Sequence, residues 1–203
     1  MTPARPQPRR SPTAGDDRLE FLRGFLTKPK EVGSIIPSSR FLERRIIRCA
    51  DVASAKTVVE LGPGTGGTTR AMLRAMAPHA RLLSIEINPD LHALVSRISD
   101  ARFIAHHGSA EGLQEALETY GLGAPDLVVS GIPFSTMGEA AGDRVLRSIA
   151  AALAPGGRFV AYQVSSRVDA LCRPIMGPAR VETEIFNVPP LRIYSWEKKA
   201  GAP

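Results

Sequence analysis

Two acidic residues and a glycine-rich turn form the part of this sequence that could bind a charged small molecule. Glu60 lies two residues before the first glycine of the turn Gly62-Pro63-Gly64-Thr65-Gly66, and Glu86 ends the next expected strand, residues 81–86. Glycine adopts backbone angles that other residues avoid, so such a turn lets the backbone approach a ligand closely. The spacing therefore predicts a binding site at the ends of two neighbouring strands.

The elements around this turn are an expected strand, residues 58–61, and an expected helix, residues 68–77. Strand, turn and helix in this order open a βαβ unit, and the free N–H groups at the helix start favour an anionic group. Residues 62–67 also fit the dinucleotide motif G-x-G-x-x-G, so spacing alone does not exclude NAD. An acid at each strand end is better suited to a ligand with an ammonium group and a ribose, and without a pyrophosphate. S-adenosyl-L-methionine (SAM) is such a ligand.

The string Glu-Leu-Gly-Pro-Gly-Thr-Gly, residues 60–66, resembles motif I of the class I SAM-dependent methyltransferases. The resemblance implies an α/β, Rossmann-like fold, with SAM as cofactor and S-adenosyl-L-homocysteine as product. It also implies that the turn holds the methionine part of SAM and that Glu86 binds the ribose. Many such enzymes have an Asp near the adenine where this chain has Ser109. The residues expected to bind the cofactor are Ser34, Ile35, Glu60, Gly62, Gly64, Thr65, Gly66, Glu86, Ile87, Ser109, Ala110 and Ser130.

The end of the fourth expected strand, residues 126–130, should face the transferable methyl group, because ligands lie outside the carboxyl ends of such strands. Enzymes that methylate the amine of a nucleobase resemble one another in an Asn/Asp-Pro-Pro-Tyr/Phe or Asn-Leu-Pro-Tyr/Phe string here. This chain has Ser130-Gly131-Ile132-Pro133-Phe134, which places Gly131 where the polar side chain should be. The missing hydrogen-bond acceptor argues against adenine as the substrate.

An aliphatic amine is the other kind of acceptor that this strand end could serve. Its pKa lies near that of Lys, about 10.4, so it must lose a proton before it attacks. A partly desolvated site beside a sulfonium lowers that pKa. Hydroxyl groups of Ser130 and Tyr162, or backbone carbonyls, would orient the amine, and Phe134 would hold a methylammonium by a cation–π contact. The expected catalytic residues are Ser130, Gly131, Ile132, Pro133, Phe134 and Tyr162.

Three further strings, at residues 32–39, 130–134 and 187–190, resemble the bacterial phospholipid N-methyltransferases, which convert phosphatidylethanolamine towards phosphatidylcholine. That family is similar to the rRNA adenine dimethyltransferases. The resemblance runs from about Phe21 to Trp196 and departs at Ser109, at Leu191 and around residues 161–163. It implies N-methylation of a phospholipid amine. Methylation of an ornithine lipid, methylation of a nucleic-acid adenine, and a non-catalytic binding role remain as alternatives.

The positive charge of the chain is concentrated at its start. Residues 1–50 contain 11 Lys and Arg against 5 Asp and Glu, whereas residues 51–203 contain 15 of each. A localised basic region favours an anionic partner, either nucleic acid or a membrane surface. Residues 18–30 fit an amphipathic helix that lies in a headgroup layer or, alternatively, covers the core. The expected membrane and substrate contacts are Phe21, Leu22, Phe25, Leu26, Lys28, Lys30, Arg167 and Arg192.

The remaining expectations concern organisation. We expect a disordered basic tail at residues 1–17, amphipathic and basic helices at 18–50, and a SAM-binding catalytic domain at 51–203. The sheet should have seven strands, mainly parallel, with a C-terminal antiparallel hairpin. Two distant cysteines indicate reduced thiols and no metal site. No apolar run could span a membrane and no signal peptide is evident, so we expect a cytoplasmic protein. We expect it to bind the inner face of the cell membrane and to have no nucleic-acid partner.

Overall fold

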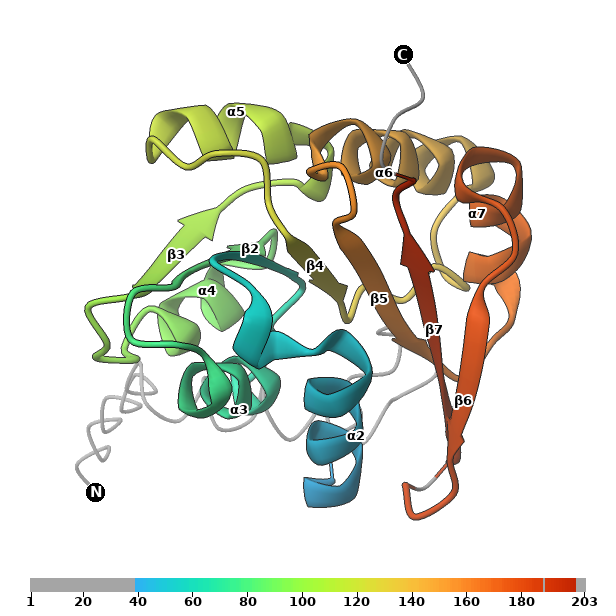
Figure 1. The fold of residues 1–203 in the computed structure, drawn as a ribbon, viewed down its shortest axis with the longest axis horizontal. Coiled ribbons are helices and arrows are strands. Elements are labelled where there is room, and N and C mark those ends of the chain that lie inside the picture. Colours follow the sequence, from blue (N-terminus) through green and yellow to red (C-terminus); the bar gives the residue numbers. More distant parts are fainter. Residues whose placement is uncertain (1–38, 188, 200–203) are drawn as a thin grey trace, which may run out of the picture. The chain divides into compact units, whose positions relative to one another are not determined.

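The computed structural model describes residues 39–187 and 189–199 (Figure 1). All of these residues belong to one compact unit, which begins at Ile36. Several sequence predictions lie outside the described residues and stay predictions. These are the tail at 1–17, the amphipathic segment 18–30 with Phe21, Leu22, Phe25, Leu26, Lys28 and Lys30, and the cofactor residues Ser34 and Ile35.

The sheet has seven strands in the order β3-β2-β1-β4-β5-β7-β6. Strands β1 to β5 are parallel, and β7 is antiparallel to both β5 and β6. Their bounds are β1 Thr57–Leu61, β2 Arg81–Glu86, β3 Phe103–His107, β4 Leu127–Ser130, β5 Arg158–Gln163, β6 Arg180–Glu184 and β7 Leu191–Glu197. This topology confirms the predicted α/β, Rossmann-like fold with a mainly parallel sheet and a C-terminal hairpin.

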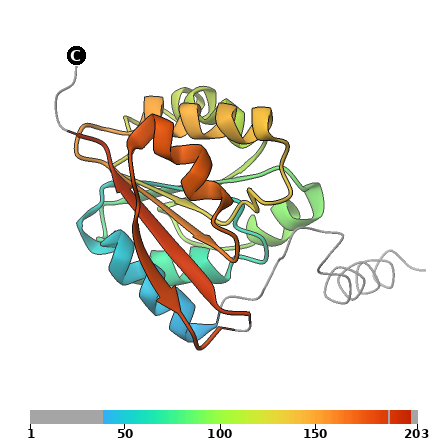
Figure 2. The same ribbon diagram turned by 90° about the vertical axis from the view of Figure 1, so that its right-hand side faces the viewer.

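Helices cover both faces of the sheet (Figures 1 and 2). Their bounds are α2 Arg40–Ala50, α3 Gly67–Ala75, α4 Pro89–Val95, α5 Leu113–Thr119, α6 Glu139–Ala152 and α7 Arg167–Met176, with 3-10 turns η1 Val52–Ser54 and η2 Ala110–Gly112. Helices α2 and α3 share one hydrophobic cluster with the sheet, and α5, α6 and α7 share the other. Helix α5 was not expected from the sequence.

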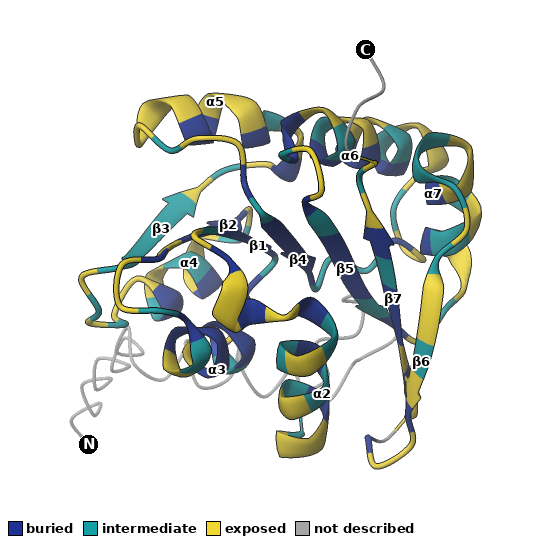
Figure 3. Ribbon diagram, viewed as in Figure 1, coloured by how far each residue is buried: buried dark blue, intermediate teal, exposed yellow. Residues whose placement is uncertain are grey.

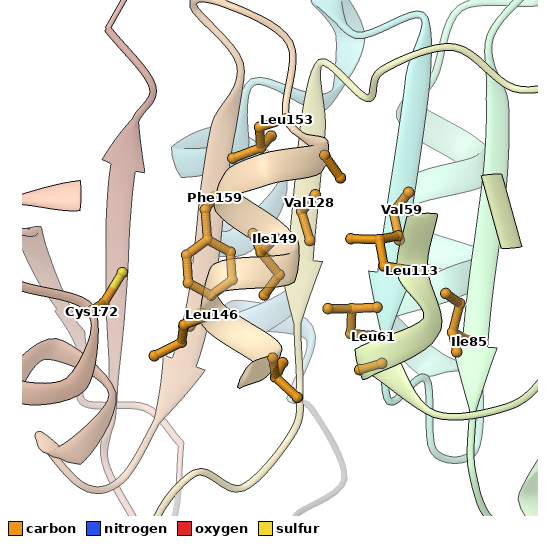
Figure 4. Packing of buried hydrophobic residues seen from close by; sticks show 14 of the residues in the cluster. Val59, Leu61, Ile85, Leu113, Val128, Leu146, Ile149, Leu153, Phe159 and Cys172 are labelled. Atoms are coloured by element: carbon orange, nitrogen blue, oxygen red, sulfur yellow. The ribbon is translucent and has the colours of Figure 1, made fainter. Parts of the chain in front are cut away.

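The central strands are buried along nearly their whole length because both faces are covered (Figure 3). Successive side chains alternate between the two clusters: Val59 and Leu61 of β1 pack towards α5 and α6, and Val58 packs towards α2 and α3. Figure 4 shows the first cluster, in which Leu146 and Ile149 of α6 lie against Phe159 of β5. A two-sided core of this kind explains the continuous apolar runs of these strands.

The carboxyl ends of the parallel strands meet at one edge of the sheet, which we call the carboxyl edge. Leu61, the last residue of β1, is paired with Ile85 of β2 and with Ser130 of β4. The turn between β6 and β7 lies at the same edge, because Arg192 of β7 is paired with Gln163 at the end of β5. Helix α2 begins at this edge too, since it runs back towards the amino end of β1 (Figure 1).

Two further findings concern membrane spans and metals. Within the described residues, none of the helices is long and apolar enough to cross a membrane. The same part of the chain contains no group of three or more His, Cys, Asp or Glu side chains placed to hold a metal ion.

Candidate active site

The glycine-rich turn after β1 depends on backbone conformations that favour glycine. Gly62, Gly64 and Gly66 have φ angles of 72°, 56° and 82°. The Gly62 N–H donates to the carbonyl of Ile85 at 3.0 Å, which ties the turn to β2. A Cβ atom at Gly62 would lie 3.3 Å from the Ile132 side chain, so the turn also packs closely against the loop after β4. The turn therefore lies at the boundary between β1, β2 and β4, where the direction of the chain connections reverses.

Glu60 is a fully buried carboxylate at the centre of this boundary. Its Oε2 accepts hydrogen bonds from Thr69 Oγ1 at 2.6 Å and from Ser84 Oγ at 2.5 Å. Its Oε1 is buried and has no hydrogen-bond partner among the described residues. Burial raises the pKa of Glu60 to about 7, although the two hydroxyl groups oppose that rise. The unpaired oxygen fits either a proton or a cationic group of a ligand.

Glu86 ties the end of β2 to the glycine turn. Its carboxylate accepts hydrogen bonds from the Asn88 N–H at 2.9 Å and from the Gly64 N–H at 3.3 Å. The next residue, Ile87, has 69% of its surface exposed, and its carbonyl contacts His107 Nε2 at 3.1 Å. A carboxylate beside an exposed apolar side chain suits the polar sugar and flat base of a nucleoside. The sequence predicts that Glu86 binds the ribose and that Ile87 belongs to the cofactor site, and both roles stay predictions.

Ser109 and Ala110 lie after β3, at the start of η2. The Ser109 hydroxyl accepts a hydrogen bond from the Glu111 N–H at 3.2 Å and so caps this short turn. Ala110 is buried against the core. The Ser109 side chain thus has a structural partner of its own, and the cofactor-binding role expected for Ser109 and Ala110 stays a prediction.

The strand β4 ends beside the glycine turn, and its last residues are held by polar contacts. Ser130 is buried, and its hydroxyl accepts a hydrogen bond from the Ile132 N–H at 3.3 Å. The Ile132 carbonyl accepts a hydrogen bond from Gln163 Nε2 at 2.6 Å. Gln163 was not among the expected site residues, although a polar side chain at the end of an apolar strand was a signal for it.

Gly131 is the position at which this site leaves no room for a side chain. A Cβ atom there would overlap the Tyr162 hydroxyl and would lie 2.8 Å from the carbonyl oxygen of Gly62. Real Cβ atoms are essentially never found this close to other atoms. The Tyr162 hydroxyl therefore occupies the space into which an Asn or Asp at position 131 would extend.

The Tyr162 hydroxyl, which lies next to Gly131, is neutral. Burial and the nearby Glu60 carboxylate raise its pKa above the usual value for tyrosine, and its hydroxyl group is hydrogen-bonded to Thr68. A neutral hydroxyl can both donate and accept hydrogen bonds. Tyr162 thus places a polar group next to Gly131, and the amine-orienting role expected for it stays a prediction.

The structure gives Phe134 a different place from the one expected. Its side chain is fully buried in the hydrophobic cluster formed with α6 and α7. A Cβ atom on Gly142 of α6 would lie only 3.7 Å from the Phe134 ring. Because core side chains cover the ring, it does not offer a face for a cation–π contact, and that part of the sequence prediction is wrong. Pro133, by contrast, is half-buried at the turn itself.

Arg167 and Arg192 lie at the carboxyl edge close to the end of β5. Arg167 begins α7, and Arg192 is paired with Gln163 in the sheet. Both side chains are exposed, and neither forms an ion pair with another described residue. They are therefore available to an anionic group that reaches this edge.

Comparison with known proteins identifies the family. A family model described as a methyltransferase domain matches residues 58–157. The ornithine lipid N-methyltransferase of Singulisphaera acidiphila is 31% identical over 145 residues, which cover 70% of this chain and 76% of that protein. This chain belongs to the class I SAM-dependent methyltransferases.

Two further methyltransferases are similar to it over different lengths. The ribosomal RNA small subunit methyltransferase A of Caulobacter vibrioides is 37% identical over 95 residues, which cover 45% of this chain and 34% of that protein. The crystal structure of precorrin-6y C5,15-methyltransferase from Geobacter metallireducens has a TM-score of 0.63 and 13% identity, and covers 81% of this chain and 93% of that one. At this identity the second likeness shows the fold alone, and the first spans only about a third of the rRNA enzyme.

The residues of this methyltransferase fit SAM, the cofactor of its family. The unpaired Oε1 of Glu60 is a buried acceptor for a cationic ligand, and the glycine turn with positive φ angles permits close approach of the methionine part. Glu86 and Ile87 lie next along the same edge for the ribose and the base. Bound SAM supplies an electrophilic methyl group on a sulfonium.

We expect SAM binding to depend on pH through Glu60. The carboxyl holds its proton up to about pH 7 because burial raises its pKa, and a cationic ligand competes with that proton. The dissociation constant of SAM should fall about tenfold between roughly pH 6 and pH 8 and then level off. Isothermal titration calorimetry across this range measures it. In the Glu60→Gln variant, the dissociation constant should depend on pH only through the titration of SAM itself. If the variant shows the same pH dependence as wild type, Glu60 is not the titrating group.

We also expect Gly131→Ala to inactivate the enzyme. The added methyl group must displace the Tyr162 hydroxyl or the Gly62 backbone, and a shift of about 1 Å in a site costs roughly a hundredfold in rate. Single-turnover kinetics with saturating SAM measures the loss. Gly138→Ala in the same loop is the matched control, because a Cβ atom there meets nothing within 4 Å. Equal activity of both variants would show that the space at Gly131 is not critical.

Proposed function

We propose that this methyltransferase transfers methyl groups from SAM to the amine of a membrane aminolipid, either an ornithine lipid or phosphatidylethanolamine. The observation that carries the proposal is the filled space at Gly131, where Tyr162 takes the place of the side chain that nucleobase enzymes use. The relative named as an ornithine lipid N-methyltransferase supports the same class of acceptor and favours the ornithine lipid.

The chain's own residues can prepare an aliphatic amine for attack. The pKa of a free alkyl amine is about 10.4, so the ammonium must lose a proton near neutral pH. Desolvation beside buried Ser130 and the neutral Tyr162 hydroxyl disfavours the charged form and so lowers that pKa. The Tyr162 hydroxyl then accepts one amine N–H and leaves the lone pair free to point at the methyl group.

The head group needs an anion-binding site next to the amine. An ornithine lipid carries a carboxylate and phosphatidylethanolamine a phosphate, and both lie a few bonds away from the reacting nitrogen. Arg167 and Arg192 are exposed cations without an ion pair within the described residues, and they lie beside the end of β5. Charge-assisted hydrogen bonds from these side chains would fix the head group and thereby the amine.

A nucleobase acceptor is the second candidate, because the rRNA methyltransferase from Caulobacter vibrioides is 37% identical over part of its length. That similarity covers 45% of this chain. An adenine amine needs an acceptor side chain in the plane of the base, and the structure fills that position with a tyrosine hydroxyl. The geometry therefore favours an acceptor that is not planar.

Substrate identity can be tested with the full chain and SAM carrying a labelled methyl group. The acceptors are vesicles containing ornithine lipid, vesicles containing phosphatidylethanolamine, and an rRNA transcript, each presented separately. We expect label in one or both aminolipids and none in RNA, with lipid masses raised in whole methyl steps. Label in RNA alone would contradict the proposal.

We expect Tyr162→Phe to lower the rate of methyl transfer without weakening SAM binding. The variant loses one hydrogen bond to the amine, which corresponds to a fall in kcat of about tenfold to a hundredfold. Single-turnover assays and calorimetry separate the two quantities. Tyr120→Phe, on an exposed side chain at the end of α5, is the control and should behave like wild type. A parallel loss of SAM affinity in Tyr162→Phe would assign this residue to the cofactor site instead.

A further inference from the structure

Exposed apolar side chains gather where the β6–β7 turn meets the start of α2. Phe41, Ile185 and Phe186 are 53%, 65% and 66% exposed, and the rings of Phe41 and Phe186 lie 5.3 Å apart. Pro189 and Pro190 of the same turn are also exposed. We call these five residues the tip patch. Neighbouring exposed apolar side chains of this size mark an interaction surface rather than chance exposure.

Hydrogen bonds and an ion pair join the two segments that carry the tip patch. Asn187 is buried; its Oδ1 accepts a hydrogen bond from the Ser39 N–H at 3.3 Å, and its Nδ2 donates to the Pro189 carbonyl at 3.1 Å. Arg45 of α2 forms an ion pair of 2.6 Å with Glu184 at the end of β6. The turn and the helix start are thus joined on both sides of the aromatic pair. These contacts hold the segments that carry the two exposed rings.

The charge around the tip patch is positive. The acids of this region are paired: Glu184 with Arg45, and Glu182 with Arg45, Arg48 and Arg180. Arg40 and Arg44, one helical turn apart on α2, are exposed and have no ion pair with another described residue. The side chains left without a counter-charge beside Phe41 are therefore cations, which complement an anionic surface.

The position of the tip patch relates it to the active site. Both lie at the carboxyl edge: the β6–β7 turn leads into β7 next to the end of β5, and the Gly62 turn follows β1 at the same edge. The amine of an aminolipid stays in the headgroup layer, so the enzyme must turn this edge towards the membrane. Any apolar side chains on the edge then meet the lipid interface.

We propose that the tip patch docks this enzyme on anionic bilayers. Phe41 and Phe186 enter the boundary between headgroups and acyl chains, and Arg40 and Arg44 bind lipid phosphates. The inference rests on the proposed function, since a lipid substrate is what requires this edge to face a membrane. The surface combines residues from α2 and from the β6–β7 turn, so it exists only in the folded protein.

Phe186→Trp provides a direct test of insertion. The chain has a single tryptophan, Trp196, which is only 3% exposed, so a tryptophan at position 186 gives a separate signal. With vesicles rich in phosphatidylglycerol we expect its emission to shift to the blue and to be quenched by lipids brominated on their acyl chains. Vesicles of phosphatidylcholine alone should cause less change. Blue emission without vesicles that vesicles do not alter would show that another part of the chain or a second copy covers the patch, and would overturn the proposal.

Loss of docking is tested with Phe41→Ser/Phe186→Ser in the full chain. Because the variant removes two phenylalanine rings from the lipid interface, the partition coefficient for anionic vesicles should fall at least about tenfold. Methylation of lipid in vesicles should fall with it, whereas methylation of the same lipid dispersed in detergent and SAM binding should stay at wild-type levels. Tyr120→Ser is the control for exposed aromatic loss. Arg40→Glu/Arg44→Glu should also weaken docking, with Arg81→Glu at the opposite edge as its control.

The outcomes separate this inference from the proposed function. If no aminolipid is methylated but the tip variants still lose vesicle binding, the patch is supported and the function is not. If aminolipids are methylated and the tip variants bind and turn over vesicles like wild type, the docking proposal fails alone. Loss of RNA binding in the tip variants, with vesicle binding intact, would assign the patch to nucleic acid and also overturn the proposal.

Discussion

The buried carboxylate of Glu60 is the interaction on which the site depends. It accepts hydrogen bonds from a helix, through Thr69, and from the neighbouring strand, through Ser84, so it joins three elements at the point where the glycine turn begins. Burying a carboxylate is unfavourable unless it is paired, and the pKa of about 7 shows how incompletely two hydroxyl groups offset that cost. A buried carboxylate whose desolvation cost is only partly offset by hydrogen bonds favours the binding of a cation. The cofactor of the family carries a positive charge that would pair with the free Oε1 of Glu60.

The second constraint is steric and acts on the acceptor. Gly131 is not simply a flexible residue, because Tyr162 from the next strand and the Gly62 carbonyl close the space that a side chain would need. A planar amine needs an acceptor fixed in its own plane, whereas an alkyl amine needs only a lone pair aimed at the methyl group. A hydroxyl from β5 can serve the second requirement. Under the proposed function, the class of acceptor would depend on which strand supplies the polar atom.

Local signals allowed the cofactor half of the site to be predicted from the sequence. The turn, both acids and the bounds of β2 depend on residues close in the chain, and the structure places them together as expected. Contacts between segments far apart in the chain could not be predicted from such local signals. The string Pro133-Phe134 predicted a cation–π contact, yet the Phe134 ring is buried in the core with side chains of α6 and α7. The contact of Tyr162 with Gly131 and the pairing of Phe41 with Phe186 likewise depend on strand order and register.

The same strand order brings the candidate active site and the exposed β6–β7 turn to one edge of the sheet. The antiparallel β7 returns the chain to the carboxyl edge, so the fold places a turn beside the end of β5 whatever its sequence. In this protein that turn carries Ile185 and Phe186 at the surface, and Asn187 anchors it to the start of α2. A turn that served only to connect two strands would gain solubility from polar side chains at these positions. Keeping apolar side chains there, with unpaired arginines beside them, is consistent with an edge that meets the layer in which a lipid amine lies.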